Sequence, residues 1–247
     1  MNMPLSDDAW KTYSFDSSKT VQYLGELVQI LTGMGIDITN KDQLKEGFGR
    51  LFHIEYINIP DMDNHSCILA PNHVSDFDAL ILGLVHENIK IMAKSDWAEN
   101  EKLMEFLKFG YDLIGVNRES RVSQARALVG LIKHLNCQEP RHALIFPQGT
   151  ISDVNKNSVE RVQPGIFVLS GKSSTPIVPV FVEQPNFNFP TRIVFGDPMD
   201  IPGPKEDCRA LWIEKIISLQ NSLTPPARMP VLTQKHANNN KPGDLYF

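Results

Sequence analysis

The chain has 247 residues, of which 42% are hydrophobic and 21% charged, and its formal net charge is −5. This length suits one substantial domain, and the composition is that of a globular protein rather than a disordered one. The acidic balance argues against a dedicated nucleic-acid binder, because phosphate contacts need a surplus of basic residues. We therefore expect no nucleic acid among its partners.

The cysteines and the N-terminus indicate the cellular setting. The chain has three cysteines, Cys67, Cys137 and Cys208, which are far apart in sequence. Because their number is odd and no Cys-x-x-Cys pair occurs, neither a disulfide framework nor a zinc site is indicated. The first ten residues lack the apolar core of a signal peptide, and no run of about 18 uncharged apolar residues predicts a membrane-spanning helix. The expected location is cytoplasmic, with a peripheral position on the inner face of a membrane left open.

Three parts are predicted along the chain: an N-terminal helical segment (1–48), an α/β domain (49–223) and a flexible C-terminal tail (224–247). The first part contains an amphipathic helix over residues 19–36. We expect this helix to pack on the domain. The alternative, a helix lying on a membrane surface, is weakened by the absence of Lys and Arg from its polar face.

Strands and helices alternate from about residue 51 to 200. The pattern predicts, in chain order, strand 67–70, helix 76–86, strand 89–94, helix 99–109, strand 113–116, helix 122–135, strand 142–146, helix 166–170, strands 177–183 and 192–195, and a closing helix at 205–223. Such alternation favours a single α/β domain with a mixed, mostly parallel sheet flanked by helices. Sites in such sheets gather at loops that leave the strand ends.

A histidine and an aspartate, His73 and Asp78, lie in and just after the loop that follows the first of these strands. Histidine accepts a proton near neutral pH, because its reference pKa is about 6.5, and a carboxylate on its other ring nitrogen fixes the tautomer. A loop that leads into the first turn of a helix can bring residues five apart together. The spacing alone is weak, and a purely structural histidine is the alternative. Asp76 could simply cap the helix.

Three further motifs follow at later strands. Gly115–Arg118 ends in an arginine after an apolar run, Phe146–Ser152 reads Phe-Pro-Gln-Gly-Thr-Ile-Ser, and Pro179 lies within an apolar strand. Together with Asn72–Asp78, these blocks resemble the glycerolipid acyltransferases of the lysophosphatidic acid acyltransferase (1-acylglycerol-3-phosphate O-acyltransferase) type. The first block of that family is Asn-His-x4-Asp and its third is Phe-Pro-Glu-Gly-Thr-Arg-Ser. The resemblance spans residues 69–182.

The resemblance implies an acyltransferase that moves a fatty acyl group from acyl-CoA or acyl carrier protein to a hydroxyl of a lysophospholipid-like acceptor. His73 would be the general base, with Asp78 orienting it, and neither a metal nor a bound cofactor is needed. The implied substrate-binding residues are Asn72, Arg118, Phe146, Pro147, Gln148, Gly149 and Thr150. The planar guanidinium of Arg118 suits a phosphate, and its alternative is a surface ion pair with Glu119. A membrane surface is open as a further partner, and Phe187 and Phe189 are apolar loop residues that could touch it.

Two positions depart from the third block of the family. Gln148 replaces a glutamate and loses its charge, and Ile151 replaces an arginine and loses both charge and hydrogen bonding. These changes suggest an acceptor other than ordinary lysophosphatidic acid, without a terminal phosphate. The cations that could compensate are Arg118, Arg121, Arg161 and Lys172. The alternatives are acylation of a non-phosphorylated small molecule or amino-lipid, and a non-catalytic lipid- or acyl-carrier-binding member of the fold.

Overall fold

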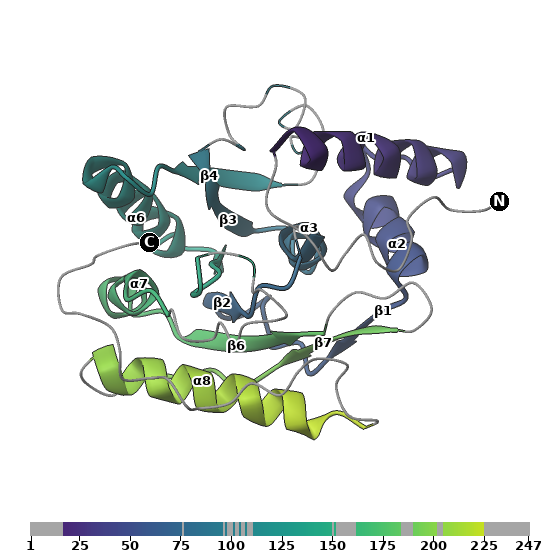
Figure 1. Ribbon diagram of the computed structural model, residues 1–247. Helices are drawn as coiled ribbons and strands as arrows, with labels where there is room; N and C mark the ends of the chain where they lie inside the picture. Colours follow the sequence, from purple (N-terminus) through teal and green to yellow (C-terminus); the bar gives the residue numbers. More distant parts are fainter. Residues whose placement is uncertain are drawn as a thin grey trace.

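The computed structural model describes residues 17–75, 77–95, 97, 101, 104, 107, 111–149, 151, 162–183, 190–201 and 205–224; of residues 17–23, 205 and 206 it describes the backbone alone. These residues form one seven-stranded sheet with helices on both faces (Figure 1). The predicted α/β class with a mostly parallel sheet is thereby confirmed. The predicted helix 99–109 lies mostly outside the described residues, and Phe187, Phe189 and residues 225–247 lie wholly outside them.

The strands follow the order β1-β7-β6-β2-β5-β3-β4 across the sheet. Neighbouring strands run parallel, except that β6 and β7 are antiparallel. Their bounds are β1 (Ile54–Ile57), β2 (Cys67–Pro71), β3 (Ile89–Lys94), β4 (Asp112–Val116), β5 (His142–Leu144), β6 (Ile177–Val182) and β7 (Thr191–Phe195). Because β2, β5, β3 and β4 are parallel neighbours, their carboxyl ends share one edge of the sheet, and the loops that leave them lie together.

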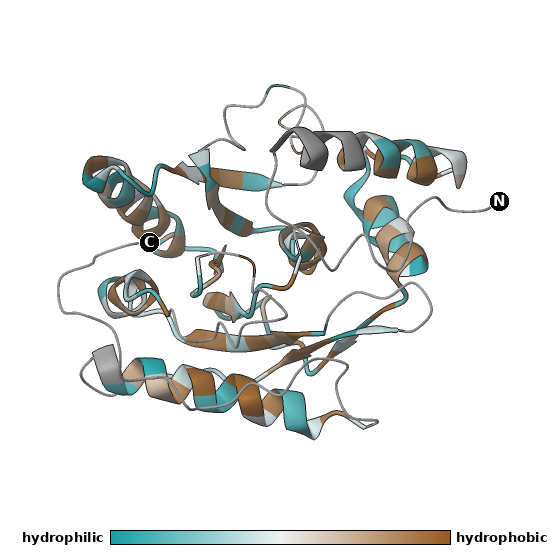
Figure 2. Cartoon of the chain, in the orientation of Figure 1, coloured by the Kyte–Doolittle hydropathy of each residue, from teal (hydrophilic) through white to brown (hydrophobic). Residues whose placement is uncertain are grey.

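The helices divide into two groups, one on each face of the sheet. Those on the first face are α1 (Ser17–Gly33), α2 (Lys41–Phe52) and α3 (Phe77–Gly83), and those on the second are α6 (Arg121–Leu135), α7 (Gly165–Ser173) and α8 (Lys205–Ser222). Alternate residues of β6 serve the two faces: Val178 and Val180 pack with the first group, and Ile177 and Phe181 with the second. Figure 2 shows the hydrophobic colouring running along the central strands.

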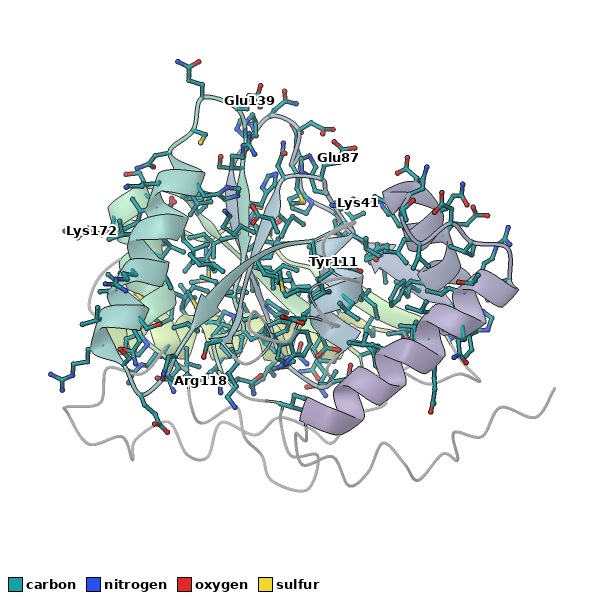
Figure 3. The ribbon with its side chains drawn as sticks, turned by 90° about the horizontal axis from the view of Figure 1, so that it is seen from above. Lys41, Glu87, Tyr111, Arg118, Glu139 and Lys172 are labelled. Carbon is teal, nitrogen blue, oxygen red and sulfur yellow. The ribbon has the colours of Figure 1, made fainter. Side chains whose placement is uncertain are left out.

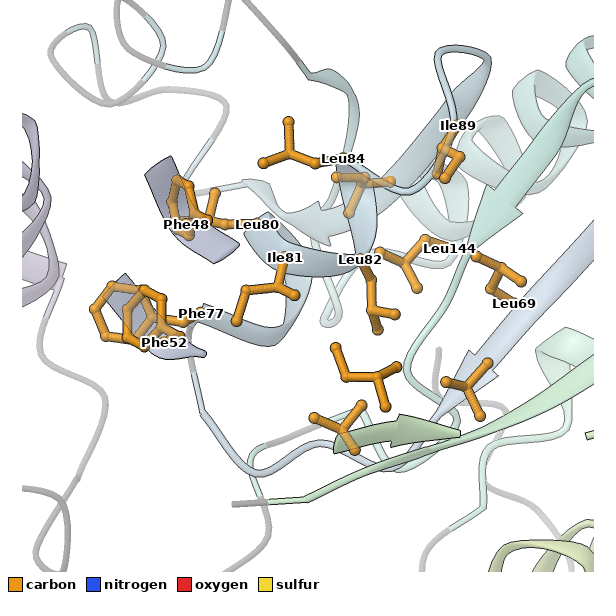
Figure 4. Close-up of a cluster of buried hydrophobic side chains, with 14 of the residues drawn as sticks. Phe48, Phe52, Leu69, Phe77, Leu80, Ile81, Leu82, Leu84, Ile89 and Leu144 are labelled. Atoms are coloured by element: carbon orange, nitrogen blue, oxygen red, sulfur yellow. The ribbon is translucent and has the colours of Figure 1, made fainter. Parts of the chain in front are cut away.

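Helix α3 is short and almost wholly buried. Leu80, Ile81 and Leu82 are each at most 2% exposed and pack between the sheet and α2 (Figure 4). At its first residue, the Phe77 ring lies 5.4 Å from the Phe52 ring of α2. The helix ends at Gly83, three residues before the predicted end. Burial on several sides fixes the position of its first turn, which carries Asp78.

Helix α2 and strand β1 were not predicted from the sequence pattern. Gly47 and Gly49 weaken the helical signal of α2, because glycine is a poor helix former. Tertiary contacts override this propensity, since Leu44, Phe48 and Phe52 at helical spacing are all buried. The Asn40 side chain also caps the helix by accepting a hydrogen bond from the Gln43 N–H, and α2 extends past the boundary predicted at residue 48.

The helix over 19–36 is confirmed as α1, which ends at Gly33. Its described side chains Leu24, Leu27 and Leu31 belong to the core of the first face. Among the described residues, no helix is both long enough and apolar enough to cross a membrane.

Candidate active site

The candidate site lies where β2, β5, β3 and β4 end. Arg118 follows β4 at this edge, and Figure 3 shows it on the opposite side of the molecule from Glu87 and Glu139. The loop after β2 carries His73, and the loop after β5 carries Phe146 and Gly149. Sheet topology therefore brings together His73 and Gly149, which are 76 residues apart in sequence.

His73 and Asp78 form a direct pair. The imidazole Nδ1 of His73 lies 3.1 Å from Oδ2 of Asp78. The Asp78 carboxylate is fully buried, whereas the His73 side chain is 15% exposed. A proton on Nδ1 shared with the carboxylate leaves Nε2 as the nitrogen that can accept a proton from a substrate.

The Asp78 carboxylate is held by the loop that precedes α3. Its Oδ2 accepts hydrogen bonds from the backbone N–H groups of Val74 and Ser75, at 2.6 and 2.8 Å, and its Oδ1 accepts one from the Ser75 hydroxyl at 2.7 Å. A carboxylate with donors on both oxygens cannot rotate freely. Its Oδ2 therefore keeps a fixed position beside Nδ1 of the His73 ring.

Two residues of the loop after β5 fix His73 from the other side. The backbone N–H of His73 donates to Oε1 of Gln148 at 2.8 Å. The ring of Phe146 stacks on the imidazole, with 4.0 Å between centroids and 27° between planes. Backbone, ring face and Nδ1 of His73 are thus each constrained by a different neighbour.

Asn72 anchors the same loop to the adjacent strand β6. Its side-chain N–H donates to the Val182 carbonyl at 2.9 Å, and its side-chain oxygen accepts from the Val182 N–H at 2.7 Å. The residue is 2% exposed. Its amide therefore continues the sheet pairing one residue beyond β2 and sets the point where the loop leaves the sheet.

A cleft of about 470 Å³ opens beside His73. Most of its lining is apolar, and its cationic residues are Lys94 and Arg118. The full lining is His73, Ala79, Leu80, Ile91, Met92, Ala93, Lys94, Trp97, Leu107, Leu113, Val116, Arg118, Ile145, Phe146, Pro147, Gly149, Ile151, Gln163 and Ile166. This size and lining suit a ligand with a long apolar part and a polar end.

Lys94 was missed by the sequence analysis. It ends β3, where it pairs in register with Val116 of β4, two residues before Arg118. The pairing of these two strands explains why both cations reach one cleft. A sequence signal was available, since Lys94 is the last residue of a predicted strand at the edge where sites gather.

Arg118 is positioned by the start of α6. Its backbone carbonyl accepts a hydrogen bond from the Gln124 side chain, which is only 4% exposed. Ser120 caps the helix by accepting from the Ser123 N–H, and the Ser123 hydroxyl accepts from the Asn117 N–H. These contacts fix the turn that carries Arg118 to the cleft.

The predicted site residues fall into two groups. His73, Arg118, Phe146, Pro147 and Gly149 all line the cleft. By contrast, Asn72 and Gln148 are 2% exposed and contact the backbones of Val182 and His73. Thr150 lies outside the described residues, as do Asp76, Ser152 and Arg161.

The fold and this site define an α/β protein whose histidine–aspartate pair, of the kind that serves in general base catalysis, opens on a largely apolar cleft. The Acyltransferase family model matches residues 35–183, and the chain belongs to this family. This confirms the resemblance drawn from the four motifs.

Among solved structures, the chain is similar to the crystal structure of the 1-acyl-sn-glycerophosphate (LPA) acyltransferase, PlsC, from Thermotoga maritima, with 21% identity and a TM-score of 0.50. The match covers 85% of this chain and 84% of that chain. No curated protein matches the chain in sequence.

Proposed function

We propose that the protein transfers a fatty acyl group from a thioester to a hydroxyl of a lysophospholipid-type acceptor, with His73 as the general base. The observation that carries this proposal is the pairing of His73 with a buried, fully hydrogen-bonded carboxylate at the wall of an apolar cleft. Membership in the Acyltransferase family supports the reaction type.

The orientation of the His73 ring supports the following reaction. Nε2 of His73 takes the proton of the acceptor hydroxyl as its oxygen attacks the thioester carbonyl, and Asp78 stabilises the imidazolium that forms. Collapse of the tetrahedral intermediate breaks the C–S bond and leaves the new ester. The proton on Nε2 then passes to the departing thiolate, which restores the neutral imidazole. This sequence uses no acyl-enzyme, metal or bound cofactor, because the thioester supplies the activated acyl group.

The lining of the cleft supports an anionic acceptor. Lys94 and Arg118 both line the cleft. Ile151 also lines it, at the position where the third block of the glycerolipid acyltransferases has an arginine. Gln148 does not weaken this reading, since its side-chain oxygen contacts the His73 backbone. We therefore favour a phosphate-bearing lysophospholipid over the unphosphorylated acceptor suggested by the sequence alone. The guanidinium of Arg118 and the ammonium of Lys94 would contact the phosphate.

The competing hypothesis of a non-catalytic binding protein conflicts with the geometry of the dyad. A protein that only binds lipid has no need for a buried carboxylate that holds one ring nitrogen of a cleft histidine. Asp78 makes four hydrogen bonds, one of them with the His73 ring. This arrangement supports catalysis.

The proposal is tested by incubating the protein with a panel of acyl thioesters and candidate alcohols and identifying the products by mass spectrometry. Each phosphorylated acceptor is paired with its dephosphorylated form. We expect an O-acylated product and a clear preference for the phosphorylated member of each pair. No acylated product with any pair would contradict the proposed reaction, and a preference for the dephosphorylated members would contradict the role given to Lys94 and Arg118.

A variant of Lys94 tests whether its charge contributes to binding of the phosphorylated acceptor. Lys94→Met keeps the length and apolar stem of the side chain and removes its charge. The KM for the phosphorylated acceptor should rise about tenfold or more, while the KM for the dephosphorylated acceptor stays within about twofold.

A lysophospholipid acceptor resides in a membrane, so the protein would act at a membrane surface. Flotation with liposomes that contain the acceptor measures this association. A protein that acylates lysophospholipid yet never co-floats would instead take its acceptor from solution.

A further inference from the structure

The exposed side of α6 carries an alternating stripe of basic and small apolar side chains. Val122, Arg126, Val129 and Lys133 follow one another at spacings of four, three and four residues, and therefore lie in a row along the helix. Val122 is 61% exposed and Val129 50% exposed. Arg121 and Ala125 lie beside the row and are also exposed. We call these six residues the α6 outer face.

The charge of this region is opposite to that of the whole chain. The protein has 29 acidic and 24 basic residues, yet neither α6 nor its neighbour α7 contains an Asp or a Glu. Within the part of the chain that the structure describes, Arg121, Arg126 and Lys133 make no ion pair. Lys172 of α7 is exposed on the same side of the molecule (Figure 3), and Glu119 is the nearest acid in sequence. The face therefore has charge available for an acidic partner.

The distribution of residues on the α6 outer face favours an acidic protein over an anionic membrane as its partner. A helix that lies in a membrane surface separates a large apolar face from its basic one, with Trp, Phe or Leu to insert. The apolar side of α6 instead faces the protein interior, because Ala127 is buried and Leu131 and Leu135 belong to the core of the second face. The exposed apolar residues are two valines and an alanine set between cations. This mixture matches a protein–protein interface, in which small apolar contacts sit within a ring of charge.

The α6 outer face leads to the active-site cleft. Arg121 begins the helix, and the preceding turn carries Arg118, which lines the cleft. Gln124 of the same helix holds the Arg118 backbone. A partner seated along α6 would therefore have one end beside the mouth of the cleft, where an acyl thioester must be delivered.

We propose that the α6 outer face docks an acidic carrier protein that presents the acyl thioester to the cleft. This inference rests on the proposed acyl-transfer function and selects, between the two donor types, the one that needs a protein surface. Arg126 and Lys133 make the electrostatic contacts, and Val122 and Val129 make the apolar ones. Docking by such a surface raises the association rate and weakens with salt.

The test compares one acyl group on two donors, acyl carrier protein and CoA, with the same acceptor. The double variant Arg126→Glu/Lys133→Glu reverses two charges outside the cleft. With the carrier-bound donor, its kcat/KM should fall about tenfold or more, chiefly through KM, and its salt dependence should flatten. With the CoA donor, kcat/KM should stay within about twofold of wild type. The matched control Arg50→Glu/Lys215→Glu makes the same change of net charge on α2 and α8 and should leave both donors unaffected.

Equal loss with both donors, no loss with either, or the same loss in the control would overturn the docking role. Co-sedimentation with anionic vesicles is measured in parallel. Vesicle binding that the double variant abolishes, with carrier kinetics unchanged, would assign the face to a membrane and also overturn it. Calorimetric binding of the acylated carrier at low salt decides docking independently of turnover. Absence of transfer from both donors would contradict the proposed function, whereas carrier binding that the double variant abolishes would still support the docking site.

Discussion

Asp78 is held by four hydrogen bonds, three of them onto Oδ2 and one onto Oδ1. Replacing it with asparagine keeps the shape and lets the amide oxygen face the Oδ2 donors, while the amide nitrogen can donate to the Ser75 hydroxyl oxygen. The charge that stabilises the imidazolium is lost. We expect Asp78→Asn to lower kcat by about 10²- to 10⁴-fold, measured with the preferred donor and acceptor.

Ser75→Ala is the matched control for this substitution. It removes the contact to Oδ1 and leaves the charge and the Oδ2 donors in place, so kcat should fall far less than in Asp78→Asn. Comparable losses in the two variants would show that loop geometry, rather than the carboxylate charge, limits the reaction.

The Gln148 side chain contacts the backbone of His73, so a charge placed at residue 148 lies close to the imidazole and should influence the reaction. Gln148→Glu keeps an oxygen that accepts from the His73 N–H but adds a negative charge close to the ring. This charge stabilises the imidazolium, so the acid limb of the kcat/KM profile should move to higher pH, by about one unit.

Gln148→Met lacks the acceptor and adds no charge. It should lower kcat without moving the pH profile, since it loosens the His73 backbone and leaves the electrostatics unchanged. An unmoved profile in Gln148→Glu, or equal profiles in the two variants, would contradict this role for Gln148.

At the scale of elements, the close approach of α3 to β3 depends on a glycine. A Cβ built on Gly83 lies 2.7 Å from Cδ1 of Ile91 and 2.9 Å from Cδ1 of Tyr111. Gly83→Ala should therefore force these side chains apart and lower the free energy of unfolding by about 1–2 kcal/mol, measured by urea denaturation.

Gly25 in α1 provides the opposite case. Nothing lies within 4 Å of a Cβ at this position, so Gly25→Ala should raise the free energy of unfolding by about 0.5–1 kcal/mol through helix propensity. Stabilisation by both substitutions would show that α3 and β3 are packed less tightly than described.

The sequence predicts elements well where local pattern and tertiary packing agree. Strands β2 and β6 are buried at every residue, and their apolar runs were sufficient to find them. Helix α2 was missed because its glycines lower the local signal, and its stability comes from the burial of Phe48 and Phe52.

The candidate site shows the same division. The pairing of His73 with Asp78 is local and followed from the motif and its family context. The contact between Gln148 and the His73 backbone joins residues 75 apart, and the convergence of Lys94 with Arg118 depends on the β3–β4 register. Neither could be predicted without the sheet topology, because the spacing along the chain does not contain it.

At the scale of the whole molecule, a buried histidine links stability to pH. His142 lies at the amino end of β5, where Nδ1 accepts a hydrogen bond from the Cys67 N–H. Burial, and then the neighbouring His86, lower the pKa of His142 to about 4. The Met62 backbone opposes this shift, and His134 and Asp63 add smaller effects that lower and raise the pKa, respectively. The folded state therefore resists protonation of this ring, whereas the unfolded chain binds a proton at its ordinary pKa of about 6.5.

The sign of the effect follows directly. The unfolded state binds more protons between about pH 6.5 and 4, so stability is lost as pH falls through this window. From about pH 7 to about pH 5, His142 should account for a loss of about 2 kcal/mol in the free energy of unfolding. His142→Gln retains an acceptor for Cys67 and does not titrate, so its urea midpoint should depend less on pH. An identical pH dependence in this variant would contradict the account.

The central claim is that the imidazole of His73, held by Asp78 at the wall of the cleft, removes the proton of the acceptor hydroxyl. The most direct measurement is the rate of acyl transfer by wild type and by His73→Ala with the same donor and acceptor, alongside the thermal unfolding midpoint of each. We predict a rate lower by about 10²- to 10⁴-fold with a nearly unchanged midpoint. An unchanged transfer rate in the His73→Ala protein would contradict the claim.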